Sequence, residues 1–307
     1  MSRVSGRWKL GFALALTTAI LWGILPIALK GVMETLDPIT TTFFRFALAA
    51  VLLTPYIFLR LRRRSSHNPK RFRSNKLLLQ LLVAGLLLTG NYGLYILGLE
   101  RTTAEAAQLM IQVAPMLLLL SGLWVFGERF SRAQWIGFGA FFSGLLMFFS
   151  PRFYDVFVAI NAYGVGMLMV LLAAVLWTGY AILQKFLLRE FSSQETMLVF
   201  YWIGALVFLP FTDFSTLAEL SNLQWGLLIF CGLNTLIAYG SFAEAMVHIE
   251  ASKVSTILAL TPLVTIITVH IIPFDGLTVE PLGPLSISGA MLVVIGSMVT
   301  ALNKTSD

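Results

Sequence analysis

Ten long apolar stretches divide the chain, and no other feature limits its fold as strongly. Each stretch is long enough to cross a bilayer as a helix, which takes about 17–25 residues. Only 12% of the residues are charged, against about 25% in an average soluble domain. A helical bundle is favoured over a β-barrel because the stretches are continuously apolar and a helix satisfies its backbone polar groups within the segment. The predicted spans are residues 10–29, 38–59, 77–98, 104–126, 134–150, 163–184, 196–212, 225–243, 252–272 and 282–302.

The basic residues are unevenly distributed between the two sides of this predicted bundle. With the N-terminus in the cytoplasm, the 21 lysine and arginine residues all fall in cytoplasmic segments except Lys30, Arg45, Arg101 and Arg152. Cytoplasmic loops carry the excess of basic residues, so both termini are expected in the cytoplasm. The one-sided distribution of the basic residues, rather than the net charge of +6, therefore indicates membrane orientation, and no nucleic-acid partner is expected. The basic loop from Arg60 to Lys76 is interpreted as a topology anchor, although such loops also attract anionic lipid.

Two further features concern the cysteine content and the first apolar run. The single cysteine, Cys231, excludes an intramolecular disulfide and a thiolate metal cluster. The first run is too long for a signal peptide and lacks a small-residue cleavage site, so it is interpreted as a retained span. No cofactor is expected.

The two halves of the chain resemble each other. The segment AILWGILPIALK, which contains Trp22, aligns with AVLWTGYAILQK, which contains Trp177. One constant offset places Pro115 on Pro262 and Tyr92 on Tyr239. Repeats of this kind indicate repeated structural units. Each half holds five spans, an odd number, so the second half must enter the membrane from the opposite side. The sequence thus predicts an all-α membrane protein of two inverted five-helix repeats, residues 1–150 and 151–307.

Inverted repeats predict a substrate site near the middle of the membrane, where discontinuous helices meet. Pro26, Pro115 and Pro262 are expected to break the first, fourth and ninth spans, because proline removes a helical hydrogen bond. Polar and aromatic residues lie within two or three turns of these prolines. The expected substrate-binding residues are Trp22, Arg45, Asn91, Tyr92, Gln108, Gln112, Trp177, Tyr180, Tyr239, Ser255 and Thr261.

Alternative roles exist for several of these side chains. An arginine within a span is costly, which predicts either a function or a carboxylate partner for Arg45. The partners at the same level would be Glu34, Asp37 or Glu105, and the alternative is snorkelling to the headgroups. Gln108 and Gln112 share one helix face and could instead form interhelical hydrogen bonds, each worth around 0.6 kcal/mol.

Two further groups of residues suggest packing and surface roles. Gly137 and Gly144 in the fifth span, and Gly289 and Gly296 in the tenth, predict close helix packing within the chain or in a homodimer. The interfacial His248 and His270, with Glu244 and Glu250 nearby, are better interpreted as solvated groups than as a proton relay.

Several motifs in order resemble one known family. They are AILWGILPIALK, Arg45-Phe46, the block from Tyr92-Gly93 to Pro115, Gly127-Glu128-Arg129 and Gln134-Trp135-Ile136-Gly137. Over nearly the whole chain this pattern resembles the EamA-type drug/metabolite transporter superfamily. The resemblance implies a ten-helix carrier of the bacterial inner membrane that moves amino acids or related small metabolites, often outward. It also implies that spans one, three, four, six, eight and nine surround a central cavity. The second half departs from the pattern, with Phe274-Asp275-Gly276 in place of Gly127-Glu128-Arg129.

The sequence therefore predicts a secondary transporter that exports amino acids or related metabolites by alternating access. Its expected partners are a small-molecule substrate and the lipid bilayer. The alternative is an integral-membrane enzyme or lipid-processing protein. That alternative fits less well because the spans contain neither a metal-ligand set nor a nucleophile with a base at workable spacing, so no catalytic or metal-binding residue is expected.

Overall fold

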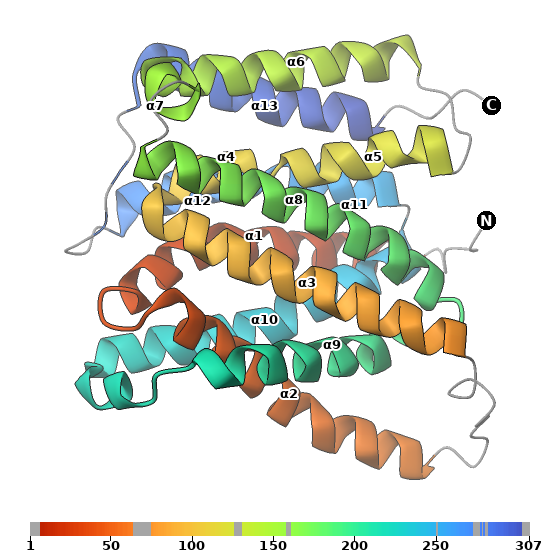
Figure 1. Ribbon diagram of the computed structural model, residues 1–307. Coiled ribbons are helices and arrows are strands. Elements are labelled where there is room, and N and C mark those ends of the chain that lie inside the picture. Colours follow the sequence, from red (N-terminus) through yellow and green to blue (C-terminus); the bar gives the residue numbers. More distant parts are fainter. Residues whose placement is uncertain are drawn as a thin grey trace.

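A computed structural model describes residues 7–63, 75–125, 131–157, 161–249, 251–272, 277, 279 and 282–302. All regular secondary structure in these ranges is helical. They include ten spans long and apolar enough to cross a membrane, which confirms the predicted number. The spans run roughly parallel to one another, and the start of the first and the end of the last lie at the same end of the bundle (Figure 1).

The helices of the first half follow the predicted spans. They are α1 (Trp8–Val32), α2 (Pro38–Arg63), α3 (Asn75–Arg101), α4 (Ala104–Met110), α5 (Val113–Val125) and α6 (Arg132–Phe149). The short elements η2 (Ser150–Arg152) and α7 (Phe153–Phe157) come next. The second half contains α8 (Ala162–Leu187), α9 (Ser193–Phe208), η3 (Leu209–Phe211), η4 (Ser215–Glu219), α10 (Asn222–His248), α11 (Ala251–Leu258), α12 (Thr261–Ile271) and α13 (Pro284–Leu302).

Local sequence signals set where several helices begin. At three starts a serine hydroxyl accepts a hydrogen bond from the backbone N–H three residues later, and the side-chain oxygen at that later position accepts one from the serine N–H. These capping boxes are Ser131 with Gln134 in α6, Ser192 with Glu195 in α9, and Ser221 with Gln224 in α10.

Helices of one half pack against helices of the other. The most extensive pairings are α1 with α10, α3 with α8, α2 with α9 and α6 with α13. In Figure 1, α6 and α13 lie together along one side of the bundle, and α2 lies along the opposite side near α9. The α4/α5 and α11/α12 spans lie between these two sides (Figure 1).

The glycine faces of the fifth and tenth spans meet each other inside the chain. A Cβ on Gly144 would lie 2.7 Å from the Gly289 carbonyl oxygen, and one on Gly296 would lie 2.6 Å from the Gly137 carbonyl oxygen. Side chains at these positions would force the backbones apart, so the small residues permit the close approach. Close packing within the chain accounts for both glycine pairs, and the homodimer stays a prediction.

The prolines act differently in the three spans. The fourth span is interrupted between α4 and α5, just before Pro115, and the ninth between α11 and α12, just before Pro262. In contrast, α1 continues as one helix through Pro26, so the expected break is not present there. Neighbouring helices supply donors to carbonyls close to Pro26: Thr265 Oγ1 lies 2.7 Å from the Gly23 oxygen, and Asn234 Nδ2 lies 2.6 Å from the Leu21 oxygen. These two bonds stabilise the backbone next to Pro26, although the carbonyl that Pro26 itself leaves without a helical donor is that of Trp22, four residues earlier.

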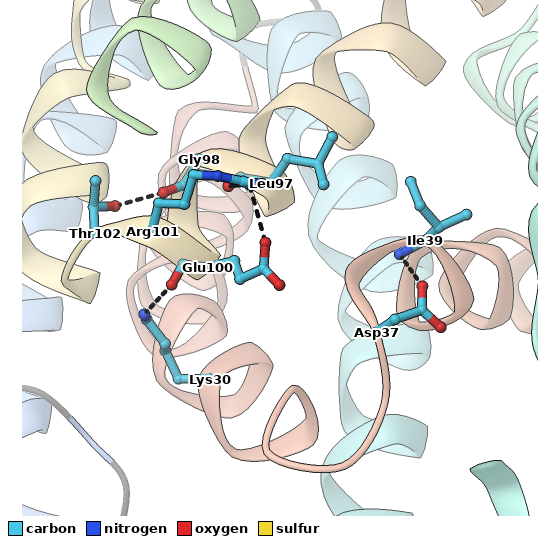
Figure 2. Close-up of polar contacts among 8 residues, drawn as sticks. All are labelled: Lys30, Asp37, Ile39, Leu97, Gly98, Glu100, Arg101 and Thr102. Carbon is cyan, nitrogen blue, oxygen red and sulfur yellow. Dashed lines mark hydrogen bonds and ion pairs between the residues drawn. The ribbon is translucent and has the colours of Figure 1, made fainter. Parts of the chain in front are cut away.

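One end of the bundle carries charged side chains that cap or tie helix ends (Figure 2). Lys30 at the end of α1 donates to the Glu100 carbonyl oxygen of α3 at 3.2 Å. Arg101 pairs with the Glu100 carboxylate at 3.0 Å. Asp37 accepts from the Ile39 N–H at 2.8 Å at the start of α2. The motif Gly127-Glu128-Arg129, its counterpart Phe274-Asp275-Gly276, Glu250 and residues 64–74 of the basic loop lie outside the described residues.

Candidate functional site

A cavity of about 90 Å³ lies among helices of both halves, next to the two helix interruptions. Since one water needs roughly 10–15 Å³ of such space, the cavity has room for several waters or a small ligand. Its lining residues are Trp22, Leu25, Arg45, Asn91, Tyr92, Tyr95, Gln108, Ile111, Gln112, Ala114, Pro115, Trp177, Tyr239, Leu258 and Thr261.

Most of the expected substrate-binding residues come together in this lining, and two do not. Tyr180 is fully buried behind the wall, with its ring centroid 6.3 Å from that of Trp177. Its hydroxyl contacts the Met197 sulfur at 3.6 Å, so it supports the lining from outside. Ser255, on α11, is buried and lies outside the lining. Of the three prolines, only Pro115 is among the lining residues.

Arg45 enters the cavity from α2 and is only 2% exposed. Its Nε donates to Thr235 Oγ1 of α10 at 3.3 Å, and its guanidinium carbon lies 4.4 Å from the Tyr92 ring centroid. A cation over an aromatic face is stabilised by the ring quadrupole. Burial rules out snorkelling to the headgroups, and none of the described carboxylates pairs with this arginine. Asp37, one expected partner, instead caps the start of α2 (Figure 2).

The two glutamines of the fourth span both line the cavity and make interhelical hydrogen bonds. Gln108 Oε1 accepts from the Tyr95 hydroxyl of α3 at 3.1 Å. Gln112 Nε2 donates to the Leu258 carbonyl oxygen at 3.2 Å. Gln112 sits at the α4/α5 interruption and Leu258 ends α11, so this bond joins the two broken spans directly. Broken helices leave backbone groups that require such partners.

The polar group of Asn91 is used in packing as well as in the lining. Its Nδ2 donates to the Ala173 carbonyl oxygen at 2.9 Å, which ties α3 to α8. By contrast, the hydroxyl of Thr261 is buried and has no hydrogen-bond partner among the described residues. That hydroxyl is therefore available to a molecule in the cavity.

Aromatic rings from three helices form a layer along the cavity. Trp22 of α1 contacts Tyr239 of α10 with ring centroids 4.9 Å apart. Phe242, one turn further along α10, lies 5.6 Å from Trp22 and 5.8 Å from Trp177 of α8. The two tryptophans that align in the internal repeat thus share one phenylalanine as a neighbour.

The sequence prediction missed Phe242 and five lining residues. Tyr95 could have been identified, because it is three residues after Tyr92 on the same face of α3. Phe242 has the same relationship to Tyr239. The apolar lining residues Leu25, Ile111, Ala114 and Leu258 carry no chemical signal that distinguishes them from other apolar residues in their spans. No group of three or more His, Cys, Asp or Glu residues within the described part of the chain is arranged to hold a metal ion.

Comparison with known proteins places this geometry in context. The model of the EamA-like transporter family matches residues 9–150 and 164–302. An uncharacterized transporter from Haemophilus influenzae is 37% identical, over 95% of this chain and 95% of its own. The uncharacterized inner membrane transporter YhbE from Escherichia coli is 35% identical, over 95% and 91%. A probable amino-acid metabolite efflux pump from Salmonella typhimurium is 24% identical, over 94% and 93%. One solved structure, at 18% identity, covers 95% of this chain and 98% of its own with a TM-score of 0.65, which indicates a similar fold.

Proposed function

Because this chain belongs to the EamA-like transporter family, we propose that it exports amino acids or related small metabolites by alternating access. It is a multi-pass transporter of the bacterial inner membrane. The family and the names of the relatives indicate transport rather than enzymatic catalysis. The amino-acid class is suggested by a relative described as a probable amino-acid metabolite efflux pump, and by a lining of amides and aromatic rings.

The observation that carries the proposal is the cavity at the two helix interruptions. In transporters with internal repeats, substrates bind where discontinuous helices from both repeats meet. Here Gln112 at one interruption bonds the Leu258 carbonyl beside the other, and both residues line the cavity. A volume of about 90 Å³ is small for a metabolite. The substrate would therefore bind as the surrounding helices move apart on one side.

The helix pairings support the proposed repeat organisation of residues 1–150 and 151–307. If each span of the first half corresponds to the fifth one after it, the pairs α2 with α9 and α6 with α13 map onto themselves. The pair α1 with α10 then maps onto the pair α3 with α8. A two-fold relation between the halves would produce this set of contacts. Two separate family matches, one in each half, also favour it.

The aromatic residues suggest how the two sides could alternate. Tyr95 and Phe242 correspond in the repeat alignment, each one turn beyond its tyrosine toward the C-terminal end of its helix. With inverted repeats, those two helix ends face opposite sides of the membrane. Phe242, in contact with Trp22 and Trp177, would close the cytoplasmic side, and Tyr95, bonded to Gln108, lies toward the other side. Exchange of these contacts would open one side as the other closes.

Transport by protein reconstituted in liposomes tests the proposal. Liposomes that contain the purified protein are loaded with a labelled amino-acid mixture, and the flux of label is compared among variants that are incorporated in equal amounts. Gln112→Leu removes the bond between the interruptions, and Trp22→Ala removes the ring that contacts both Tyr239 and Phe242, so each should reduce flux at least several-fold.

Residues of the same types elsewhere in the membrane spans provide matched controls. Gln80→Leu changes a glutamine of α3, and Trp225→Ala changes an exposed tryptophan of α10; both residues lie outside the cavity lining. These controls should transport normally. Wild-type protein that moves no amino acid or related metabolite from a broad panel would refute the proposed substrate class. Normal flux in both Gln112→Leu and Trp22→Ala would exclude the cavity as the path.

A further inference from the structure

The guanidinium of Arg45 is a buried charge with most of its hydrogen-bonding capacity unused. Of its five N–H donors, the described structure engages only Nε, through Thr235 Oγ1 at 3.3 Å. The side chain is 2% exposed and lines the cavity. A buried charge is costly unless it is paired and hydrogen-bonded, and the Tyr92 ring at 4.4 Å offsets only part of that cost. Water or a bound molecule in the cavity must therefore accept the remaining hydrogen bonds of this group.

The nearby acidic residues have other roles. Asp37 accepts two backbone N–H bonds at the start of α2. Glu34 is exposed beyond the end of α1. Glu105 is buried in the first turn of α4, where its electrostatic partner is Lys30. No described carboxylate is therefore placed to neutralise Arg45.

The cavity is positively charged as a consequence. Among the described residues that line it, Arg45 is the only charged one. The other polar groups are neutral, and they include the unpartnered hydroxyl of Thr261 and the amides of Gln108 and Gln112. Bare organic cations would meet a like charge here, whereas anions would meet a counter-charge.

We infer that Arg45 is the residue that binds a carboxylate of the transported molecule. A carboxylate presents two oxygens in a plane and matches the arginine fork with two parallel hydrogen bonds. The aromatic rings of Trp22, Trp177 and Tyr239 then contact the apolar part of the same molecule. This inference rests on the proposed function and narrows it: the substrates are carboxylates, including zwitterionic amino acids, and decarboxylated amines are excluded.

Binding of matched ligands to the full-length purified protein tests the inference. The probes are free amino acids, each compared with its own carboxamide and with the corresponding decarboxylated amine. Binding is read as the ligand-induced rise in unfolding temperature, because a ligand that binds only the folded state stabilises it. Loss of a charge-assisted pair should weaken binding on the order of tenfold to a hundredfold in the carboxamide and the amine.

Three variants separate the role of Arg45 from a general charge effect. Arg45→Gln should abolish the preference for the acid. Arg45→Lys should keep the preference but weaken it, since an ammonium cannot form the two parallel bonds. Arg101→Gln removes an exposed charge at the outer helix ends and should leave the preference unchanged. If Arg45→Gln does not fold, the role of Arg45 is tested by the wild-type ligand comparison and by Thr235→Val. Thr235→Val removes the one hydrogen bond that positions Arg45 Nε, so it should weaken the preference for the acid.

The outcomes distinguish this inference from the function on which it rests. Equal binding of acids, carboxamides and amines, together with amino-acid transport, would overturn the role of Arg45 and leave the transporter proposal standing. A preference for the acids that survives Arg45→Gln would also overturn it. Failure of every probe to bind or be transported would overturn both.

Discussion

Replacement of Gly144 by alanine is expected to destabilise the protein through backbone contact alone. The new Cβ would lie 2.6 Å from the Val293 nitrogen, 2.7 Å from the Gly289 oxygen and 3.0 Å from the Leu292 carbonyl carbon. Ordinary contacts of a Cβ begin at 3.4 Å. All three atoms belong to the backbone of α13 and cannot rotate away. Helices α6 and α13 would therefore have to separate by several tenths of an ångström along their shared face.

The size of the effect follows from two opposing contributions. Overpacking of a well-packed interior typically costs about 1–3 kcal/mol. Alanine in place of glycine within a helix returns roughly 0.5–1 kcal/mol. Gly139 on the same helix provides a matched control, because its added Cβ would meet no atom within 4 Å. Gly139→Ala should therefore be neutral or slightly stabilising, and the two variants should differ in stability by about 1–3 kcal/mol.

The single cysteine provides a direct assay. Cys231 is fully buried, so a fluorogenic maleimide should react only as the protein unfolds on heating. The midpoint of that reaction should be lower for Gly144→Ala than for wild type, and should be unchanged or higher for Gly139→Ala. If Gly144→Ala unfolds at the same temperature as Gly139→Ala or above it, the argument from backbone contact is wrong.

Two further predictions follow from the architecture. Thr265→Val removes the hydrogen bond to the Gly23 carbonyl and should lower the free energy of unfolding by around 0.6 kcal/mol. Thr268→Val changes another threonine of α12 that makes no such bond, so it should have little effect in the same thermal assay. Equal shifts in the two variants would refute the role of the Thr265 hydroxyl. The proposed topology places η4 outside the membrane and the end of α8 inside. In a background without the native cysteine, Ser215→Cys should therefore react with a membrane-impermeant maleimide in cells with an intact inner membrane, and Glu190→Cys should react only after permeabilisation. The reverse pattern would overturn the cytoplasmic placement of the termini.

Much of the fold could be predicted from local properties of the sequence. The spans follow from the length and continuity of apolar runs, because a bilayer requires about 20 apolar residues whatever they pack against. Helix starts such as Ser131 and Ser192 follow from capping boxes that involve only four consecutive residues. Most of the residues that line the cavity could also be predicted, because polar and aromatic residues near helix interruptions are typical of substrate sites in transporters with internal repeats.

Side-chain roles that depend on a partner helix were beyond prediction. Arg45 was expected near an acidic residue or at the headgroups, but its position against Tyr92 and Thr235 depends on how α2, α3 and α10 pack. Tyr180 and Ser255 lie in spans that border the cavity, yet helix rotation turns them away from its lining. The spacing of Phe242 from Tyr239 places both on one face of α10, but the contact of Phe242 with Trp22 and Trp177 exists only in the assembled bundle.

The sequence by itself determined how many times the chain crosses the membrane, because burial in lipid depends on the composition of each segment alone. The tertiary structure decided what the prolines do. Pro26 lies in a continuous helix, close to carbonyls that accept from Thr265 and Asn234, whereas Pro115 and Pro262 follow interruptions that a glutamine joins across 146 residues of chain. A proline leaves the carbonyl four residues earlier without its helical donor. Around Pro26 the neighbouring carbonyls of Gly23 and Leu21 accept from distant helices, and such contacts exist only in the folded bundle.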